Sequence, residues 1–252
     1  MHPSLAALMA KPIAHRGLHQ RQAGVIENSQ EAFARAAKHG FGIECDVQIT
    51  RDGEAVVFHD FDLDRLTGAS GRVDARSAAD LATIPLTGSG AGNAIHPLST
   101  MLDLVRGAVP IVVEIKSRFD GDLRLTRRVA EILGQSRHPV CVESFDPRIM
   151  AALRMMLPTH PRGLVAMGHY EYPDYANVPS DEKRALANLL HFSEIAPDFL
   201  SWNFKDLPSC GPFLCRSQLG LPVSAWTVRS AEDAALASSH ADQIVFEGFM
   251  PA

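Results

Sequence analysis

Eight short apolar segments with strand character, most of them separated by segments of helical periodicity, limit most strongly what this chain can fold into. The expected strands lie at residues 12–14, 42–48, 111–115, 140–144, 164–167, 198–201, 222–227 and 243–246. The expected helices lie at 28–39, 100–106, 122–135, 147–157, 180–191, 212–219 and 231–238. This alternation favours an α/β fold, a TIM (β/α)8 barrel, although an open doubly wound sheet would produce a similar pattern. We expect one domain over residues 1–252, because single barrels commonly reach this length.

One stretch departs from the alternation. Residues 51–54 read Arg-Asp-Gly-Glu and predict a hairpin turn into a further strand at 55–58, which brings His59 back beside the second strand. The following region, 61–97, is rich in Gly, Ser, Thr and Ala and predicts an insertion before the next barrel helix. We expect the hairpin and insertion, about residues 47–98, to cap the barrel mouth.

Earlier in the chain, Asn28 followed by Glu31 predicts a capping box at the start of a helix.

Composition excludes several classes of protein. The net charge is −5 and no run of Lys or Arg could act as a basic arm, so we expect no nucleic-acid partner. Charged residues interrupt every hydrophobic run before it reaches the roughly 20 residues of a membrane span, which predicts no stable membrane insertion. The four cysteines lack the C-x-x-C spacing of a zinc site, and no basic residue precedes the apolar stretch near the N-terminus. We therefore expect a protein without a signal peptide in the reducing cytoplasm.

Acidic side chains recur inside the apolar strands. Glu44 and Asp46 are two residues apart, so they project from the same side of a strand, and Glu114 and Lys116 repeat this spacing on a later strand. Unpaired buried charge is costly, so such a group needs a cation or an anionic ligand. Carboxylate oxygens favour a hard divalent cation, Mg²⁺ or Ca²⁺, as cofactor. The alternative is that Glu44 and Asp46 are solvated charges of the hairpin.

Two histidines lie at expected strand ends, and His15 and His59 could act as general base and general acid. A single histidine is more often structural or on the surface, and the chain has 11 of them. Arg16 and Lys116 match phosphate oxygens, although either could simply neutralise nearby acids. Glu27 is equally compatible with a place in the site and with an ordinary charge at the start of a helix.

At these residues the sequence resembles the glycerophosphodiester phosphodiesterase family. The motifs that carry the resemblance are His15-Arg16-Gly17, Glu27-Asn28-Ser29, Glu44-x-Asp46, His59-Asp60 and Glu114-x-Lys116, with weaker similarity at Ser144-Phe145 and Trp226-Thr227-Val228. The resemblance implies a TIM barrel, a divalent cation held by Glu44, Asp46 and Glu114, and acid–base catalysis by His15 and His59. It also implies hydrolysis of a small-molecule glycerophosphodiester to glycerol 3-phosphate and an alcohol through a cyclic phosphate. Two positions depart from the family pattern: Arg229, where asparagine is common, and Phe246-Glu247, where a Thr-Asp pair is common.

All three tyrosines lie in one segment, residues 170–175, which should follow the fifth barrel strand. Tyr170 and Tyr172 could receive a cationic alcohol such as choline or ethanolamine, or could belong to an ordinary loop packed on the barrel. Trp226 could line the same pocket or pack inside the barrel.

Two other functions remain open: a lysophospholipase D-like enzyme, and a barrel that binds phosphodiesters without turnover. The His15 and His59 pair argues against the second, since binding alone does not need two titratable rings.

Overall fold

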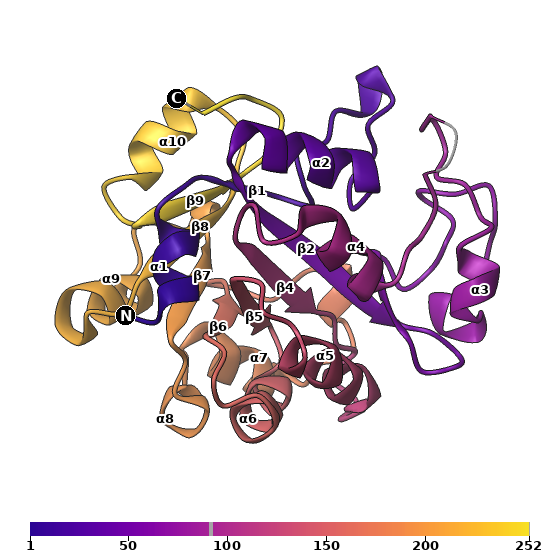
Figure 1. Cartoon of the computed structure of the whole chain (residues 1–252). Helices are drawn as coiled ribbons and strands as arrows, with labels where there is room; N and C mark the ends of the chain where they lie inside the picture. Colours follow the sequence, from indigo (N-terminus) through magenta and orange to yellow (C-terminus); the bar gives the residue numbers. More distant parts are fainter. Residues whose placement is uncertain (91–92, 252) are drawn as a thin grey trace.

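The computed structural model describes residues 1–90 and 93–251. Within them, eight parallel strands form a closed barrel (Figure 1). The strands are β1 (Ile13–Ala14), β2 (Gly42–Ile49), β4 (Ile111–Ile115), β5 (Val140–Ser144), β6 (Arg162–Ala166), β7 (Phe199–Asn203), β8 (Val223–Val228) and β9 (Gln243–Phe246). Strand β1 pairs with both β2 and β9 and so closes the sheet on itself. The predicted TIM barrel is confirmed, and all eight strands lie near their predicted positions.

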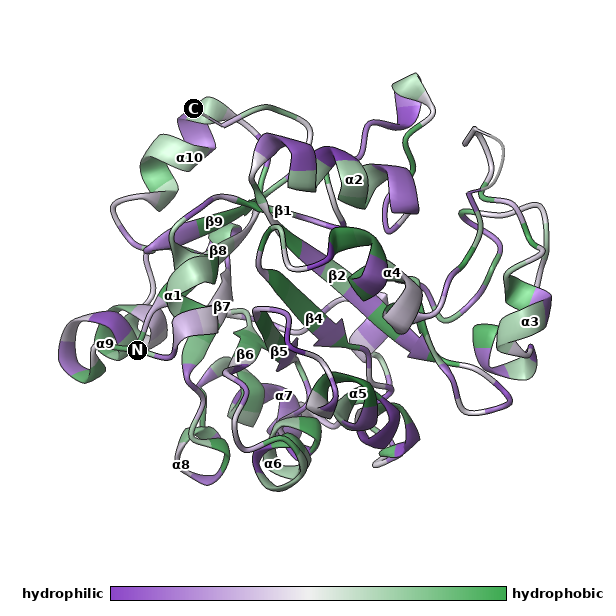
Figure 2. Ribbon diagram, viewed as in Figure 1, coloured by the Kyte–Doolittle hydropathy of each residue, from purple (hydrophilic) through white to green (hydrophobic). Residues whose placement is uncertain are grey.

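Helices surround the barrel, and most of them bury an apolar face against it (Figure 2). They are α2 (Gln30–His39), α4 (Leu98–Val105), α5 (Arg124–Gly134), α6 (Pro147–Met156), α7 (Ser180–Ala187), α8 (Phe192–Ile195), α9 (Cys210–Leu219) and α10 (Ala231–Ala237). Leu186 of α7 packs in a side cluster instead. Helix α5 illustrates the pattern, since Leu125, Val129 and Leu133 are buried at a spacing of four residues. The helical periodicity in the sequence therefore corresponds to the face that each helix turns toward the strands.

Most helix boundaries lie within two residues of their predicted positions, and two of the differences have a local structural cause. The N-cap of α2 is Ser29, whose hydroxyl accepts from the backbone N–H of Ala32, whereas Asn28 has a positive φ of 58° and its side chain points elsewhere. The helix expected over 180–191 ends at Ala187, because Leu189 adopts a left-handed φ of 56° that an α-helix cannot continue through.

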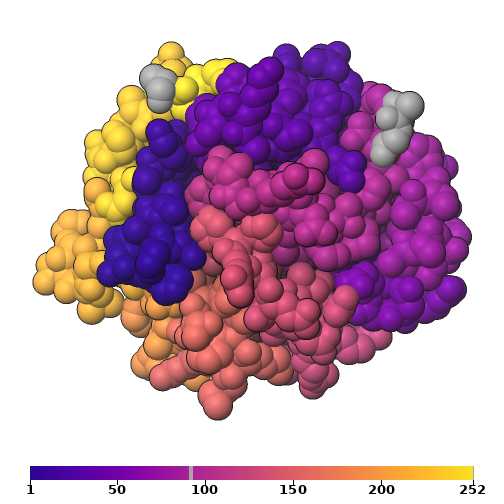
Figure 3. All heavy atoms as spheres, viewed as in Figure 1, coloured from indigo at the N-terminus to yellow at the C-terminus, as the bar shows by residue number. Residues whose placement is uncertain are grey.

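Helix α1 (Pro3–Met9) was not predicted from the sequence. Its Leu5 and Leu8 are buried against inward-facing residues of the barrel strands, including Ile13, Val112 and Phe199. Figures 1 and 3 show α1 lying over the strands on the viewer's side, where its side chains cover the surface. The apolar stretch near the N-terminus therefore closes one end of the barrel.

The segment after β2 folds as a separate small unit. Strand β3 (Ala55–Val57) pairs antiparallel with β2, and the turn η2 (Val73–Ala75) and helix α3 (Ala78–Leu81) follow. This unit has its own core, made of Ile26, Val56, Phe58, Leu63, Leu66, Val73, Leu81, Leu86 and Ile95. In Figure 1 it stands to one side of the barrel, beyond α2 and α4.

No helix among the described residues is long and apolar enough to cross a membrane.

Candidate active site

Strand register gathers acidic side chains inside the barrel. Asp46 on β2 lies opposite Glu114 on β4, and Glu114 lies opposite Glu143 on β5. Glu44 precedes Asp46 by two residues and projects from the same side of β2. All four carboxylates are buried. Residues separated by about 100 positions in the sequence therefore share one charged centre.

Three of these carboxylates form a set that could hold a metal ion. Glu44, Asp46 and Glu114 each offer one oxygen, and these oxygens lie within 4.8 Å of one another. Glu44 Oε1 is buried and has no hydrogen-bond partner in the described part of the chain. Burial, followed by the charges of Asp46 and Glu114, raises the pKa of Glu44 well above its usual value. Clustered carboxylates repel one another when they are charged, and a bound cation offsets that repulsion. Their oxygen atoms are the ligands that a hard divalent cation prefers.

Two basic side chains compensate part of this charge. Lys116 Nζ lies 2.7 Å from Asp46 Oδ1 and 2.7 Å from Glu114 Oε1. Arg16 Nε lies 3.2 Å from Asp46 Oδ2, and the backbone N–H of Arg16 donates to Glu44 Oε2 over 2.8 Å. Although burial opposes it, attraction by Lys116, His59 and Arg16 holds the pKa of Asp46 well below its usual range. Asp46 therefore remains ionised at neutral pH.

His15 is held by a carboxylate at the edge of the site. Its Nδ1 lies 2.6 Å from Glu247 Oε2, and its Nε2 lies 4.0 Å from Glu44 Oε2. Burial lowers the pKa of His15 to about 4, although the hydrogen bond with Glu247 opposes the shift. The imidazole is therefore neutral near pH 7 and can accept a proton.

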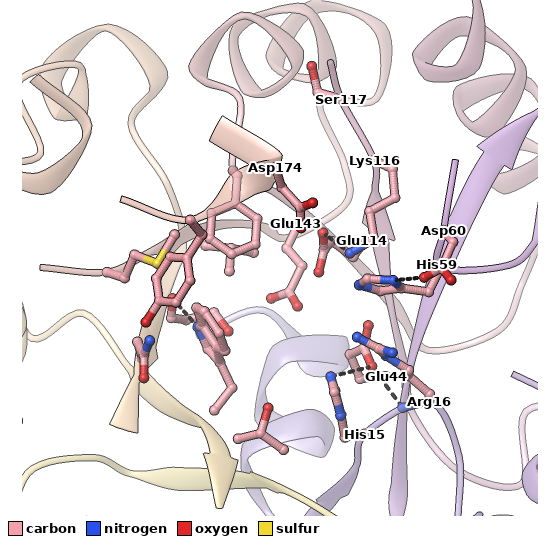
Figure 4. Close-up of a pocket in the computed structure, with 18 of the residues that line it drawn as sticks. His15, Arg16, Glu44, His59, Asp60, Glu114, Lys116, Ser117, Glu143 and Asp174 are labelled. Atoms are coloured by element: carbon pink, nitrogen blue, oxygen red, sulfur yellow. Dashed lines mark hydrogen bonds and ion pairs between the residues drawn. The ribbon is translucent and has the colours of Figure 1, made fainter. Parts of the chain in front are cut away.

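His59 has a similar environment on another wall of the cavity. Its Nδ1 lies 2.6 Å from Asp60 Oδ1, and Arg65 pairs with Asp60 and also with Glu27. Glu27 Oε1 in turn accepts from Arg16 Nη1 over 2.6 Å. An alternating chain of charges thus connects the second histidine with the arginine beside the metal-binding set. Figure 4 shows both histidines turned toward the space around Glu44 and Arg16.

These groups open into a cavity of about 680 Å³. Its wall away from the acidic set is largely aromatic and contains Phe119, Phe145, Tyr172, Tyr175 and Trp226. Four of these rings contact one another edge to face, as in the Phe145–Trp226 pair with centroids 5.5 Å apart, whereas Tyr172 stacks on His169. The cavity therefore combines charged side chains with an aromatic wall.

A sequence profile of the glycerophosphoryl diester phosphodiesterase family matches residues 15–245, which is most of the chain. The chain belongs to this family. Sequence comparison of the phosphodiesterase with curated proteins finds the Bacillus subtilis protein YhdW, provisionally named a glycerophosphodiester phosphodiesterase. The two are 28% identical over 231 residues, 88% of each chain. It also finds the glycerophosphodiester phosphodiesterase of Caldanaerobacter subterraneus, 33% identical over 163 residues, which cover 61% of this chain and 65% of the relative.

Solved structures with the same fold include two phosphodiesterases. One is the Oleispira antarctica phosphodiesterase in complex with the product sn-glycerol-3-phosphate, with a TM-score of 0.78, 20% identity, and coverage of 96% and 94% of the two chains. The other is the glycerophosphodiester phosphodiesterase of Thermotoga maritima, with a TM-score of 0.69, 24% identity, and coverage of 93% and 92%. The chain is a glycerophosphodiester phosphodiesterase, an enzyme that hydrolyses glycerophosphodiesters.

The structure of this phosphodiesterase brings most of the predicted site residues into one place. The cavity is lined by His15, Arg16, Glu44, His59, Glu114, Lys116 and Trp226. Asp46 lies beneath them and is fully buried, and Glu27 lies behind Arg16. The suggestion that Tyr170 faces the substrate is wrong, because Tyr170 is buried in a side cluster and Tyr175 lines the cavity in its place.

Three residues of the phosphodiesterase site were missed as candidates. Asn28 was assigned to a helix cap, but its Nδ2 donates to Asp46 Oδ2 over 2.9 Å. Glu143 presents the same signal as Glu114, a single acid in an apolar strand. Glu247 was noted only as a departure from the family pattern, because its contact with His15 spans 232 positions. Only the first two had a local signal that could have identified them.

Proposed function

We propose that this enzyme cleaves glycerophosphodiesters to glycerol 3-phosphate and an alcohol, with His15 and His59 as the acid–base pair and with a cyclic phosphate intermediate. The observation that carries the proposal is that two histidines, each hydrogen-bonded through Nδ1 to a carboxylate, face one cavity beside three clustered acids. The Oleispira antarctica relative with bound sn-glycerol-3-phosphate supports the choice of product.

The cofactor in this proposal is Mg²⁺ or Ca²⁺, held by Glu44, Asp46 and Glu114. Such a cation would supply Lewis-acid stabilisation of the charge on the phosphate. Arg16 and Lys116 line the same side of the cavity and can donate hydrogen bonds to phosphate oxygens. Because both are already paired with acids, they are held in place before the substrate arrives.

In the first stage, the 2-hydroxyl oxygen of the glycerol attacks phosphorus. The new oxygen–phosphorus bond forms as the bond from phosphorus to the alcohol oxygen breaks. One imidazole takes the hydroxyl proton and the other, in its protonated form, gives a proton to the leaving oxygen. An internal nucleophile needs only orientation and deprotonation, both of which a rigid cavity with fixed histidines supplies.

In the second stage, water opens the ring. The water oxygen bonds to phosphorus, the bond from phosphorus to the 2-oxygen breaks, and the two imidazoles exchange protons in the reverse direction. Glycerol 3-phosphate is released, and the histidines return to their starting protonation states. The two stages therefore require the same two rings in opposite roles.

The leaving alcohol is proposed to lie against the aromatic wall. Tyr172, Tyr175 and Trp226 line the cavity together with the acidic Asp174, which suits a cationic alcohol such as choline or ethanolamine. Tyr172→Ala should reduce the preference for glycerophosphocholine over glycerophosphoglycerol. Tyr170→Phe is the matched control, because the Tyr170 hydroxyl is buried away from the cavity.

A panel of glycerophosphodiesters assayed with and without chelator tests the central proposal, together with His15→Ala, His59→Ala and the exposed-site control His39→Ala. We expect chelator to abolish turnover and each active-site variant to lose at least roughly 100-fold in kcat, the lower range for an acid–base group. A cyclic glycerophosphate should accumulate if ring opening is slowed. A lysophosphatidylcholine arm of the panel tests the lysophospholipase D alternative.

Turnover that survives both chelation and loss of either ring would overturn the mechanism. Binding of intact phosphodiesters without any product, by a folded wild-type protein loaded with Mg²⁺ or Ca²⁺, would indicate a binding barrel instead. Faster turnover of lysophosphatidylcholine than of every glycerophosphodiester would replace the proposed substrate class.

A further inference from the structure

Three side chains near the cavity follow the ends of three neighbouring strands. Arg229 comes directly after β8, Glu247 after β9, and His15 after β1. The register places these positions side by side, since Val228 pairs with Phe246 and Ala14 pairs with Phe246. The backbone reinforces the arrangement, because the N–H of His15 donates to the carbonyl of Phe246 over 2.9 Å.

The three side chains form a continuous chain of contacts. Arg229 Nε donates to Glu247 Oε1 over 2.8 Å, and Arg229 Nη2 lies 2.7 Å from the same oxygen. The other oxygen of Glu247 lies 2.6 Å from His15 Nδ1. Arg229 and Glu247 therefore contact each other directly. Both oxygens of the Glu247 carboxylate are thereby used.

This contact determines which nitrogen of His15 carries the proton. An ionised carboxylate only accepts hydrogen bonds, so the neutral imidazole must place its N–H on Nδ1. The lone pair then remains on Nε2, the nitrogen that lies 4.0 Å from Glu44 Oε2 on the cavity side. Glu247 itself does not line the cavity, whereas His15 and Arg229 do. His19 Nε2 also lies 3.5 Å from Glu247 Oε2, but His15 makes the shorter contact with that oxygen. Glu247 therefore acts on the substrate indirectly, through the side chains that it holds.

We infer that Glu247, held in place by Arg229, is a positioning residue that fixes the ring and the tautomer of His15 for turnover. The inference rests on the proposed function in one respect, the catalytic role of His15. The same logic is familiar from catalytic triads, in which a buried carboxylate orients an imidazole without itself reacting. The competing explanation is an ordinary ion pair between Glu247 and Arg229 that stabilises the fold and has no effect on the ring.

Kinetics of the full-length enzyme with glycerophosphocholine, at saturating Mg²⁺ or Ca²⁺, distinguish these explanations. We expect Glu247→Ala to lower kcat roughly 100-fold, the upper range for groups that orient a ligand through a hydrogen bond, with KM changed less than threefold. Arg229→Ala should cause a smaller loss, about fivefold. The double variant should lose no more than Glu247→Ala alone, because both changes act through one contact chain. Arg216→Ala, which breaks the surface pair with Asp242, is the matched control.

A second readout does not depend on turnover. In ¹⁵N-histidine NMR spectra, His15 of the wild type should show the Nδ1–H tautomer, identified by loss of its signals in His15→Asn. In Glu247→Ala the ring should shift toward the Nε2–H tautomer. Glu247→Gln keeps the side-chain volume, so it provides the test if Glu247→Ala does not fold. Its amide can present either oxygen or NH₂ to the ring, so we expect a mixture of His15 tautomers and at least a tenfold loss of kcat.

Wild-type kcat and a single Nδ1–H tautomer in Glu247→Gln would overturn the inference. So would a double variant whose loss of kcat equals the product of the losses from Glu247→Ala and Arg229→Ala, because the two residues would then act independently. These results differ from a failure of the proposed function. If His15→Ala were fully active, the catalytic role of His15 would be wrong, yet the tautomer shift in Glu247→Ala would still report on positioning.

Discussion

Asn28 donates a hydrogen bond from Nδ2 to Asp46 Oδ2 over 2.9 Å, so a residue in the loop before α2 holds a carboxylate on β2. The backbone of Asn28 adopts a positive φ of 58°, which turns the side chain toward the strand and leaves the N-cap to Ser29. Because Asp46 is fully buried, the amide occupies one of the few acceptor positions of that carboxylate. The contact links the first loop of the barrel to the acidic set.

Asn28→Ala should therefore weaken the proposed cation site. Loss of the hydrogen bond frees Asp46 to reorient, and supporting contacts of this kind are worth about 10- to 100-fold in metal affinity. Isothermal titration of the chelator-treated protein with Ca²⁺ and Mg²⁺ measures the change. Asn188→Ala removes an exposed amide that bonds only to the carbonyl of Arg184, and its cation affinity should equal that of the wild type.

Gly17→Ala should reduce both stability and activity. Gly17 has a φ of +78°, and an added Cβ would lie 2.9 Å from the backbone of Ala32 in α2. Gly53 shares the positive φ, at +82°, but an added Cβ there would meet nothing within 4 Å. Gly53→Ala should cost about 1 kcal/mol of unfolding free energy for the backbone alone.

Gly17→Ala should cost about 1–3 kcal/mol of unfolding free energy beyond the cost at Gly53, the range for overpacking. It should also lower kcat, because the backbone displacement that relieves the clash with Ala32 moves the neighbouring His15 and Arg16. Urea denaturation and kinetics on both variants measure these effects. Equal costs at the two glycines would contradict the role assigned to close packing against α2.

The stability of the protein should fall as pH rises through the range where buried Glu143 ionises. Burial, and then the charge of Glu114, raises the pKa of Glu143 well above its usual value. A group whose folded-state pKa is raised contributes stability that is complete below its unfolded pKa and is lost as pH increases through the folded pKa.

In the presence of chelator, the Tm of Glu143→Gln should therefore fall less between pH 5 and pH 8 than the Tm of the wild type. The exposed Glu131→Gln is the control and should follow the wild-type profile. Identical pH profiles for Glu143→Gln and the wild type would show that the ionisation of Glu143 is not linked to folding.

Leu8→Ala should destabilise the barrel without altering its chemistry. Leu8 is fully buried where α1 covers the strands, and removal of a buried leucine side chain costs about 2–5 kcal/mol. Leu104→Ala on α4 removes a partly exposed leucine and should change stability by less than about 0.5 kcal/mol. Urea denaturation gives the difference, and kcat of the folded fraction should be unchanged in both variants.

The extent to which the sequence predicts this structure depends on how local the signal is. Strand β4 could be read from its apolar residues and α5 from its periodicity, because burial of one face imposes a repeat on neighbouring residues. The acids at positions 44, 46 and 114 were identified for the same reason, as charges inside buried strands. Helix α1 was missed because its seven residues are too few to show a repeat.

The sequence by itself determined the alternation of strands and helices, the resemblance to the family and the residue types that the site needs, since these depend on local patterns and ordered motifs. Closure of the sheet into a barrel is seen in the pairing of β1 with both β2 and β9. Only the tertiary structure decided how the residues pair. Glu247 meets His15 because β9 closes the barrel onto β1, and Arg65 reaches Glu27 because the inserted unit folds back beside the barrel. Such contacts join residues that no sequence periodicity connects, because hydrogen bonds and ion pairs depend on distance in space and not on separation along the chain.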